Sequence, residues 1–169
     1  MEEDYEQAKV WYIKAAEAGD TNAQFNLGLY YDEIEKNYDQ AKIWYTKAAE
    51  AGNANAQNNL GSYYHKIEKN YEQAKTWYTK AAEAGNTNAQ NSLGAYYYNI
   101  EENYIQAKQW WSKPAEAGNV NAQYNLGLHY DEIEKNYDQA KIWYTKAAEA
   151  GDEDAKKKLQ EINRQCIIL

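Results

Sequence analysis

The chain has 169 residues and a formal net charge of -8, from 18 lysines and arginines against 26 aspartates and glutamates. This balance argues against nucleic acid as a partner, because phosphate binding needs clustered basic side chains. One proline and nine glycines are too few for a loop-rich β protein. The single cysteine excludes an internal disulfide framework. No stretch approaches the roughly 20 apolar residues of a membrane span.

Tryptophan returns at a constant interval of 33 residues, at Trp11, Trp44, Trp77, Trp110 and Trp143. A period of this length is typical of a helical solenoid, in which each unit buries its apolar side against its neighbours. We therefore predict an all-α solenoid of antiparallel helix pairs, with about ten helices in all.

In chain order, the array begins with an unpaired helix and then repeats one unit four times. The expected ranges are 1–19 for the first helix, 20–52, 53–85, 86–118 and 119–151 for the full units, 152–165 for a closing helix and 166–169 for a tail. In the unit at 20–52, one helix starts near Asn22 and a second follows Asn37, which is expected to cap it. Gly52 is expected to end the second helix in a left-handed conformation, and Asn55 to cap the next helix.

Helical spacing predicts which side of each helix faces the stack. Ala23, Leu27 and Gly28 form one stripe on the first helix of a unit, and Gly28 leaves room for a neighbouring helix to approach closely. On the second helix, Tyr45 and Ala48 share a face, so small alanines can admit the aromatic rings of adjacent units.

The two ends of the array differ. The helix at 152–165 has Gln160 where the other units have glycine and adds three lysines, which is the polar change expected of a capping helix. The helix at 1–19 has no such cap. Either further repeats precede residue 1 or its surface pairs with something else, and a second copy of the chain is one such partner.

The residues at 23–31, Ala-Gln-x-Asn-Leu-Gly-x-Tyr-Tyr, and those at 44–52, Trp-Tyr-x-Lys-Ala-Ala-Glu-Ala-Gly, resemble the Sel-one-like repeat, a relative of the tetratricopeptide repeat. The resemblance covers nearly the whole chain. It implies a right-handed superhelix and a scaffold or adaptor whose concave face, lined by the first helices of the units, holds a peptide or protein segment. The family's Gly-x-Gly-Val turn is missing, and a shorter connection at 33–36 places Ile34 where it can fill the gap.

Some first-helix positions vary between units while the frame stays constant, so they are not needed for stacking. They are spaced i, i+4 and i+7 and form one stripe, called here the variable stripe, which we interpret as a peptide-binding groove. The alternative is a solvated surface whose residues vary between repeats because they have no role in binding. The stripe consists of Phe25, Asn58, Asn91 and Tyr124, then Leu29, Ser62, Ala95 and Leu128, then Asp32, His65, Tyr98 and Asp131.

An amide also recurs beside this stripe, at Asn26, Asn59 and Asn125, with Ser92 in the third unit. Because an amide both donates and accepts hydrogen bonds, these side chains can bind the backbone of an extended peptide. The same residues can instead fasten one helix to the next, and the sequence leaves both roles open.

The inventory of reactive side chains argues against catalysis. The only histidines, His65 and His129, lie in different units, and no serine has a histidine and an acid in a triad relationship. We therefore predict a protein that is not an enzyme, with no metal site and no cofactor.

The tail Cys166-Ile167-Ile168-Leu169 has the form of a prenylation signal, so a membrane-tethered adaptor is an alternative function. Packing of the tail against Ile162 is the competing interpretation. Without prenylation we expect no membrane contact, and the absence of a secretory pattern after Met1 favours a cytoplasmic location. A consensus-like stable array with no specific ligand is the third possibility.

Overall fold

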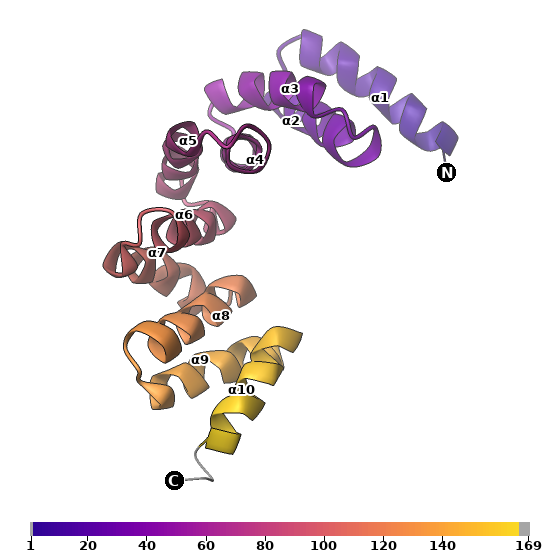
Figure 1. Cartoon of the computed structure of the whole chain (residues 1–169). Helices are drawn as coiled ribbons and strands as arrows, with labels where there is room; N and C mark the ends of the chain where they lie inside the picture. Colours follow the sequence, from indigo (N-terminus) through magenta and orange to yellow (C-terminus); the bar gives the residue numbers. More distant parts are fainter. Residues whose placement is uncertain (1, 166–169) are drawn as a thin grey trace. The chain divides into compact units, whose positions relative to one another are not determined.

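In the computed structural model, residues 2–165 are described, and every regular element among them is helical (Figure 1). The α-helices are α1 (Glu2–Glu17), α2 (Thr21–Leu29), α3 (Tyr38–Glu50), α4 (Ala54–Tyr63), α5 (Tyr71–Glu83), α6 (Thr87–Asn99), α7 (Tyr104–Glu116), α8 (Val120–Leu128), α9 (Tyr137–Glu149) and α10 (Glu153–Gln165). Consecutive helices contact one another as pairs, which confirms the predicted all-α repeat solenoid.

Side-chain caps and left-handed residues define the helix ends. The Asn37 side chain accepts from the backbone N–H of Gln40 at 3.1 Å and so caps α3, as expected, and Gly52 has a φ of 90° just after that helix. The expected cap at Asn55 is wrong. Asn53, two residues earlier, accepts from the Ala56 N–H at 2.9 Å and caps α4.

A π-helical turn extends three of the first helices into the short connection that the sequence predicts. These turns are η1 (Tyr30–Ile34), η2 (Tyr64–Glu68) and η3 (His129–Ile133). After η1, Lys36 adopts a left-handed φ of 54° and the Asn37 N–H donates to the Tyr31 carbonyl at 2.7 Å. Ile34 is 47% exposed, so it does not fill the gap between the helices.

Contacts divide the chain into two compact units, Met1–Ala89 and Gln90–Leu169, and each has its own apolar clusters. In the first unit, Tyr45 and Leu60 are almost fully buried in one cluster, with small alanines around them. In the second unit, Trp111 packs with Leu126, and Tyr144 packs in a separate cluster that includes Ile162 of α10. Large rings set among alanines supply the buried area, as predicted.

Close approach at glycine fixes the pairing of helices within a repeat. A Cβ atom placed on Gly28 would lie 2.5 Å from Cδ1 of Tyr45, and one on Gly61 would lie 2.6 Å from Cδ1 of Tyr78. Carbon atoms in contact normally stay more than 3.4 Å apart. The predicted role of Gly28 is therefore confirmed: only a residue without a side chain lets the Tyr45 ring approach the first helix this closely.

The tryptophans of the frame pack on the helix pair before them. Trp44 is 9% exposed and packs with Ala16, Ala23 and Leu27, and the Lys47 ammonium lies 3.9 Å from the centre of the indole ring. Trp11, one period earlier, is 70% exposed. The Lys14 ammonium lies 5.4 Å from the centre of the Trp11 ring, which therefore keeps the lysine contact of its counterpart Trp44 but not its burial.

A lysine in each of α1, α3 and α7 ties one repeat to the next. In the first unit, the Lys42 ammonium lies 5.3 Å and 5.0 Å from the ring centres of Tyr63 and Tyr64, and it forms an ion pair with Glu68. The hydrogen bond to Glu68 is the main reason that the pKa of Lys42 is raised. Because the ammonium lies on two rings and beside a carboxylate, this contact combines cation–π and ionic attraction.

The last repeat replaces one ring of this contact with an imidazole. Lys108 lies 4.5 Å from the ring centre of Tyr130 and 2.6 Å from Glu134, but His129 stands where the first unit has Tyr30. Nε2 of His129 is 3.0 Å from Oε1 of Glu134, and the histidine side chain is buried. Burial, with a smaller contribution from Lys108, lowers the pKa of His129, although the hydrogen bond to Glu134 opposes this shift.

This histidine should make stability depend on pH. Since the folded-state pKa of His129 is lowered, the unfolded chain takes up a proton first as the pH falls through the ordinary value of about 6.5. Folding therefore becomes less favourable from about pH 7 downward. We expect His129→Tyr to melt at a higher temperature and to lose less stability between pH 7.5 and pH 5.5, as measured by thermal denaturation. His65 is present in both the parent chain and His129→Tyr, so its contribution to the pH dependence is the same in the two proteins. An equal loss of stability in both would therefore contradict the prediction.

Candidate peptide-binding surface

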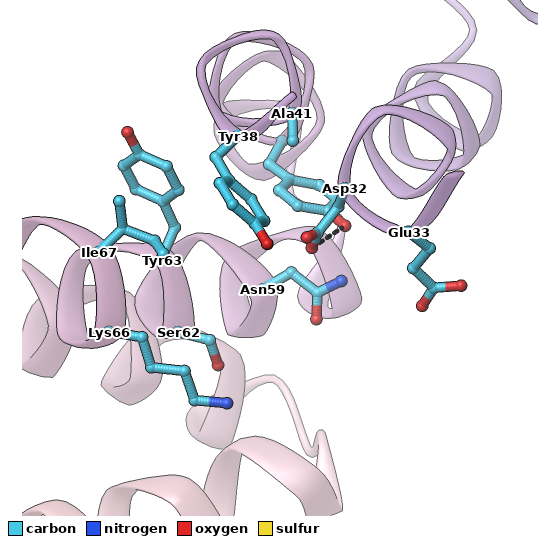
Figure 2. Close-up of a pocket in the computed structure, with 10 residues that line it drawn as sticks. Asp32, Glu33, Tyr38, Ala41, Asn59, Ser62, Tyr63, Lys66 and Ile67 are labelled. Carbon is cyan, nitrogen blue, oxygen red and sulfur yellow. Dashed lines mark hydrogen bonds between the residues drawn. The ribbon is translucent and has the colours of Figure 1, made fainter. Parts of the chain in front are cut away.

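A cavity of about 390 Å³ lies in the first unit, between the turn η1 that continues α2, helix α3, helix α4 and the turn η2 (Figure 2). We call it the α2–α4 pocket. It is lined by Asp32, Glu33, Tyr38, Ala41, Tyr45, Asn59, Ser62, Tyr63, Lys66 and Ile67. Three of these, Asp32, Asn59 and Ser62, are among the site residues predicted from the sequence.

Hydrogen bonds through Tyr45 hold the polar side of the pocket in place. The Tyr45 hydroxyl donates to Oδ2 of Asp32 at 3.1 Å. The Asn59 side chain also interacts with this hydroxyl and partly offsets the rise in the pKa of Tyr45. Burial is the main cause that raises the pKa of Tyr45, so the hydroxyl keeps its proton and remains a donor. The Asp32 carboxylate is therefore oriented by a buried ring, although its own side chain is partly exposed to solvent.

Other predicted site residues of the first unit pack on neighbouring side chains. Phe25 and Leu29 are half-buried against the cluster that contains Tyr45, and the Phe25 ring centre is 6.1 Å from that of Tyr45. The His65 ring lies 5.3 Å from that of Tyr71, and burial is the main cause that lowers the pKa of His65. These positions therefore contribute to packing as well as to the surface, and they are not freely solvated.

The amides have mixed roles. The Asn58 side chain donates to Asn59 at 3.4 Å, and Asn26 is half-buried at the equivalent place in α2. In the second unit, the Asn125 side chain donates to Oδ1 of Asn91 at 2.9 Å. Asn125 thus fastens α8 to α6, which is the structural alternative left open by the sequence, whereas Asn59 lines the α2–α4 pocket.

In the second unit, the variable stripe is rich in aromatic contacts. The Tyr98 ring centre lies 5.5 Å from that of Trp111, and the Tyr98 hydroxyl donates to Oε2 of Glu132 at 3.1 Å. Tyr124 stacks near Tyr144 with ring centres 5.7 Å apart. Ala95 packs against the Trp111 cluster, and Leu128 packs against the Tyr144 cluster.

The Asp-Glu pair of the pocket recurs in this unit. Asp131 accepts a hydrogen bond from the Tyr144 hydroxyl at 3.3 Å, as Asp32 does from Tyr45. Its neighbour Glu132 lies beside Lys158 of α10, with 3.7 Å between Oε1 and Nζ. The same Asp-Glu pair therefore lines a pocket in the first unit and lies beside a lysine in the second.

Sequence reasoning missed Tyr38, Tyr63 and Ile67 as pocket residues. Tyr38 and Ile67 are the same in all four repeats, and Tyr63 has one exception among its counterparts, His129, so comparison of the repeats did not single them out. A signal was present in Tyr38 and Ile67, since large apolar side chains at a polar helix connection are unusual, and they are 42% and 49% exposed.

Within the described residues, no three histidine, cysteine, aspartate or glutamate side chains are grouped so that they could hold a metal ion. His65 and His129 belong to different units. None of the described helices is long and apolar enough to cross a membrane. Cys166, the predicted lipidation site, lies outside the described residues.

The model of the Sel1 repeat matches the chain five times, at residues 1–20, 21–53, 54–86, 87–119 and 120–152. No curated protein sequence matches the chain. Among solved structures, the chain is similar to c5321, a protective antigen of uropathogenic Escherichia coli strains displaying an SLR fold, with a TM-score of 0.84 and 41% identity. This match covers 91% of the chain but 36% of the antigen.

A Sel1 repeat protein from Oxalobacter formigenes matches with a TM-score of 0.79 and 36% identity, over 91% of the chain and 66% of that protein. YrrB, a TPR protein with an unusual peptide-binding site, matches with a TM-score of 0.66 and 25% identity, over 94% of the chain and 84% of YrrB. The chain thus spans about a third of the first relative and just under two thirds of the second. Because the matched repeats account for residues 1–152, the chain belongs to the Sel1 repeat family, whose TPR-like solenoids are generally protein-interaction scaffolds.

Proposed function

We propose that the chain is a non-enzymatic scaffold that binds an extended or helical segment of a partner protein on its first-helix face, with the α2–α4 pocket as one anchor point. The observation that carries this proposal is the make-up of that pocket. Constant residues of the frame, such as Tyr45 and Ala41, form its walls, whereas the variable Asp32 and Ser62 place polar atoms in it. A fixed wall with exchangeable polar groups suits selective recognition of a side chain.

The size and chemistry of the pocket support this function. A volume of about 390 Å³ accommodates a large side chain and part of a backbone. Its rim offers both carboxylates and the Lys66 ammonium, so the pocket can bind partners through charge-assisted hydrogen bonds. YrrB, which shares the fold, is described as having a peptide-binding site, and this is a precedent for such binding on a similar solenoid.

A peptide selection tests the proposal. We expect heptapeptides selected from a random phage-displayed library on the immobilised chain to bind Asn59→Ala/Lys66→Ala about tenfold more weakly than the parent, because this variant loses about one charged and one neutral hydrogen bond. Isothermal titration calorimetry with synthetic peptides measures the ratio. Ile43→Ala, on an exposed side of α3, is the control and should bind as the parent does. Peptides that bind the double variant equally well would place the site elsewhere.

Two other proposals remain beside this one. Prenylation at Cys166 would add a membrane tether to the scaffold, and the evidence for it is the sequence of the tail alone. Self-association through α1 is supported by Trp11, which is 70% exposed, whereas its counterpart Trp44 is buried against the preceding helices. Neither proposal depends on the α2–α4 pocket.

A further inference from the structure

The chain contains two near-identical copies of the acidic frame of the pocket. Residues 28–52 and 127–151 have the same sequence except for Tyr30, which is His129 in the second copy. The Asp-Glu pairs at 32–33 and 131–132 therefore have the same local surroundings, and both aspartates accept a hydrogen bond from the tyrosine of the following helix. What differs is the next helix along, which is α4 for the first copy and α10 for the second.

In the second copy, a cation from the chain itself lies beside the acidic pair. Lys158 stands in α10 where Asn59 stands in α4, three periods apart. Its Nζ is 3.7 Å from Glu132 and 3.9 Å from Glu161, and its side chain is 28% exposed. The other carboxylate oxygen of Glu132 accepts from the Tyr98 hydroxyl. An ammonium therefore has a defined and partly sheltered position in this frame.

In the first copy, the equivalent position is not filled by a cation. Asn59 is neutral and shorter than lysine, its amide is engaged with Tyr45, and the α2–α4 pocket opens in front of Asp32 and Glu33. Lys66 also lines the pocket, but it forms no ion pair with either carboxylate in the part of the chain that the structure describes. Figure 2 shows its side chain running past Ser62.

We propose that Asp32 and Glu33 bind a lysine or arginine side chain of the partner segment, in the place that Lys158 takes beside Glu132. This inference rests on the proposed function and adds the chemistry of the anchoring residue. It stands on two independent observations. The α2–α4 pocket opens beside Asp32 and Glu33, and the Lys158 ammonium lies beside Glu132 in the second copy. Lys66, which also lines the pocket, is left to hydrogen-bond a backbone carbonyl or a carboxylate of the same segment.

Charge removal at matched positions tests the inference. In the heptapeptides selected on the parent chain, lysine or arginine should be enriched at one position. Asp32→Asn/Glu33→Gln should weaken their binding about tenfold, because a partly sheltered ion pair with two carboxylates is lost. Glu132→Gln removes the carboxylate beside Lys158 in the second copy and should leave the affinity within about twofold. Both variants keep an oxygen that accepts from the tyrosine, and thermal melting checks that they fold.

A gain of charge provides the second arm. Asn59→Lys copies the arrangement around Lys158, so its own ammonium should occupy the site and reduce peptide binding about tenfold or more, without lowering the melting temperature. Replacing the basic residue of the peptide with norleucine should reduce binding to the parent by a similar factor.

The outcomes separate the two proposals. Peptides that depend on Asn59 and Lys66 but tolerate Asp32→Asn/Glu33→Gln and Asn59→Lys would overturn the cation site and leave the proposed scaffold function standing. Selection that yields no peptide binding to the first-helix face would overturn both. Equal losses in Asp32→Asn/Glu33→Gln and Glu132→Gln would also overturn the cation site, because Lys158 already occupies the position beside Glu132.

Discussion

Replacing Leu60 with alanine is expected to lower the free energy of unfolding by about 2–5 kcal/mol, the usual range for a leucine removed from a packed core. Leu60 is fully buried in α4, and its cluster includes Tyr45 of α3 and Ala56 of its own helix. Rings and helix backbones surround the side chain, so the site cannot collapse to fill the cavity that alanine would leave. Urea denaturation followed by circular dichroism measures the loss.

Ile43→Ala is the matched control for this prediction, since it removes a side chain of the same size from α3. Ile43 is 46% exposed, and alanine is the better helix former, so we expect a change of no more than about 0.5 kcal/mol. Because a repeat contacts only its neighbours, hydrogen exchange in Leu60→Ala should rise most in α3, α4 and α5. Comparable losses in the two variants would show that α4 is not part of the core.

The sequence predicted the packed frame well because packing itself imposes the 33-residue pattern. Gly28, Tyr45 and Ala48 recur since a ring, a gap for it and small neighbours must return wherever two helices meet. Asn37 and Gly52 were recognisable for a related reason. Each satisfies a local backbone requirement, a cap in one case and a left-handed turn in the other, that few other residues can meet.

The details that the sequence did not predict depend on choices between near-equal alternatives. Asn53 and Asn55 are both suitable caps, and Asn53 takes the role because the helix starts directly after the left-handed Gly52. The π-helical turn at Tyr30–Ile34 involves the same residue types as an α-helix, so helix propensity cannot reveal it. Wider winding carries the first helix through the connection and leaves Ile34 at the surface.

The candidate site could be predicted only in part for a different reason. Comparison of repeats finds residues that vary, and it therefore found Asp32 and Ser62. Tyr45 has two roles, since its ring fills the gap at Gly28 and its hydroxyl orients Asp32. Because of the first role, tyrosine occupies this position in three of the four repeats. A residue that serves both packing and the site is invisible to that comparison.

Replacing Gly61 with alanine is expected to lower the free energy of unfolding by about 1–3 kcal/mol, the usual cost of overpacking a core. In an exposed helix the same substitution would stabilise by about 1 kcal/mol, so the sign itself tests the structure. The new Cβ would lie 2.6 Å from Cδ1 of Tyr78, whose side chain is 4% exposed. The ring cannot move aside without leaving its contacts, because its hydroxyl also hydrogen-bonds to Ser62 at 3.2 Å.

A double-mutant cycle shows whether the ring is the cause. Tyr78→Leu removes the atoms that a Cβ at position 61 would meet, so it should cost less stability in the Gly61→Ala background than in the parent chain, with a coupling of about 1 kcal/mol or more. Urea denaturation of the four proteins gives this coupling. Additive losses would mean that alanine at position 61 acts through something other than Tyr78. A positive coupling would show that the glycine at this position is required by the ring of its own repeat, and the same requirement links Gly28 to Tyr45 beside the α2–α4 pocket.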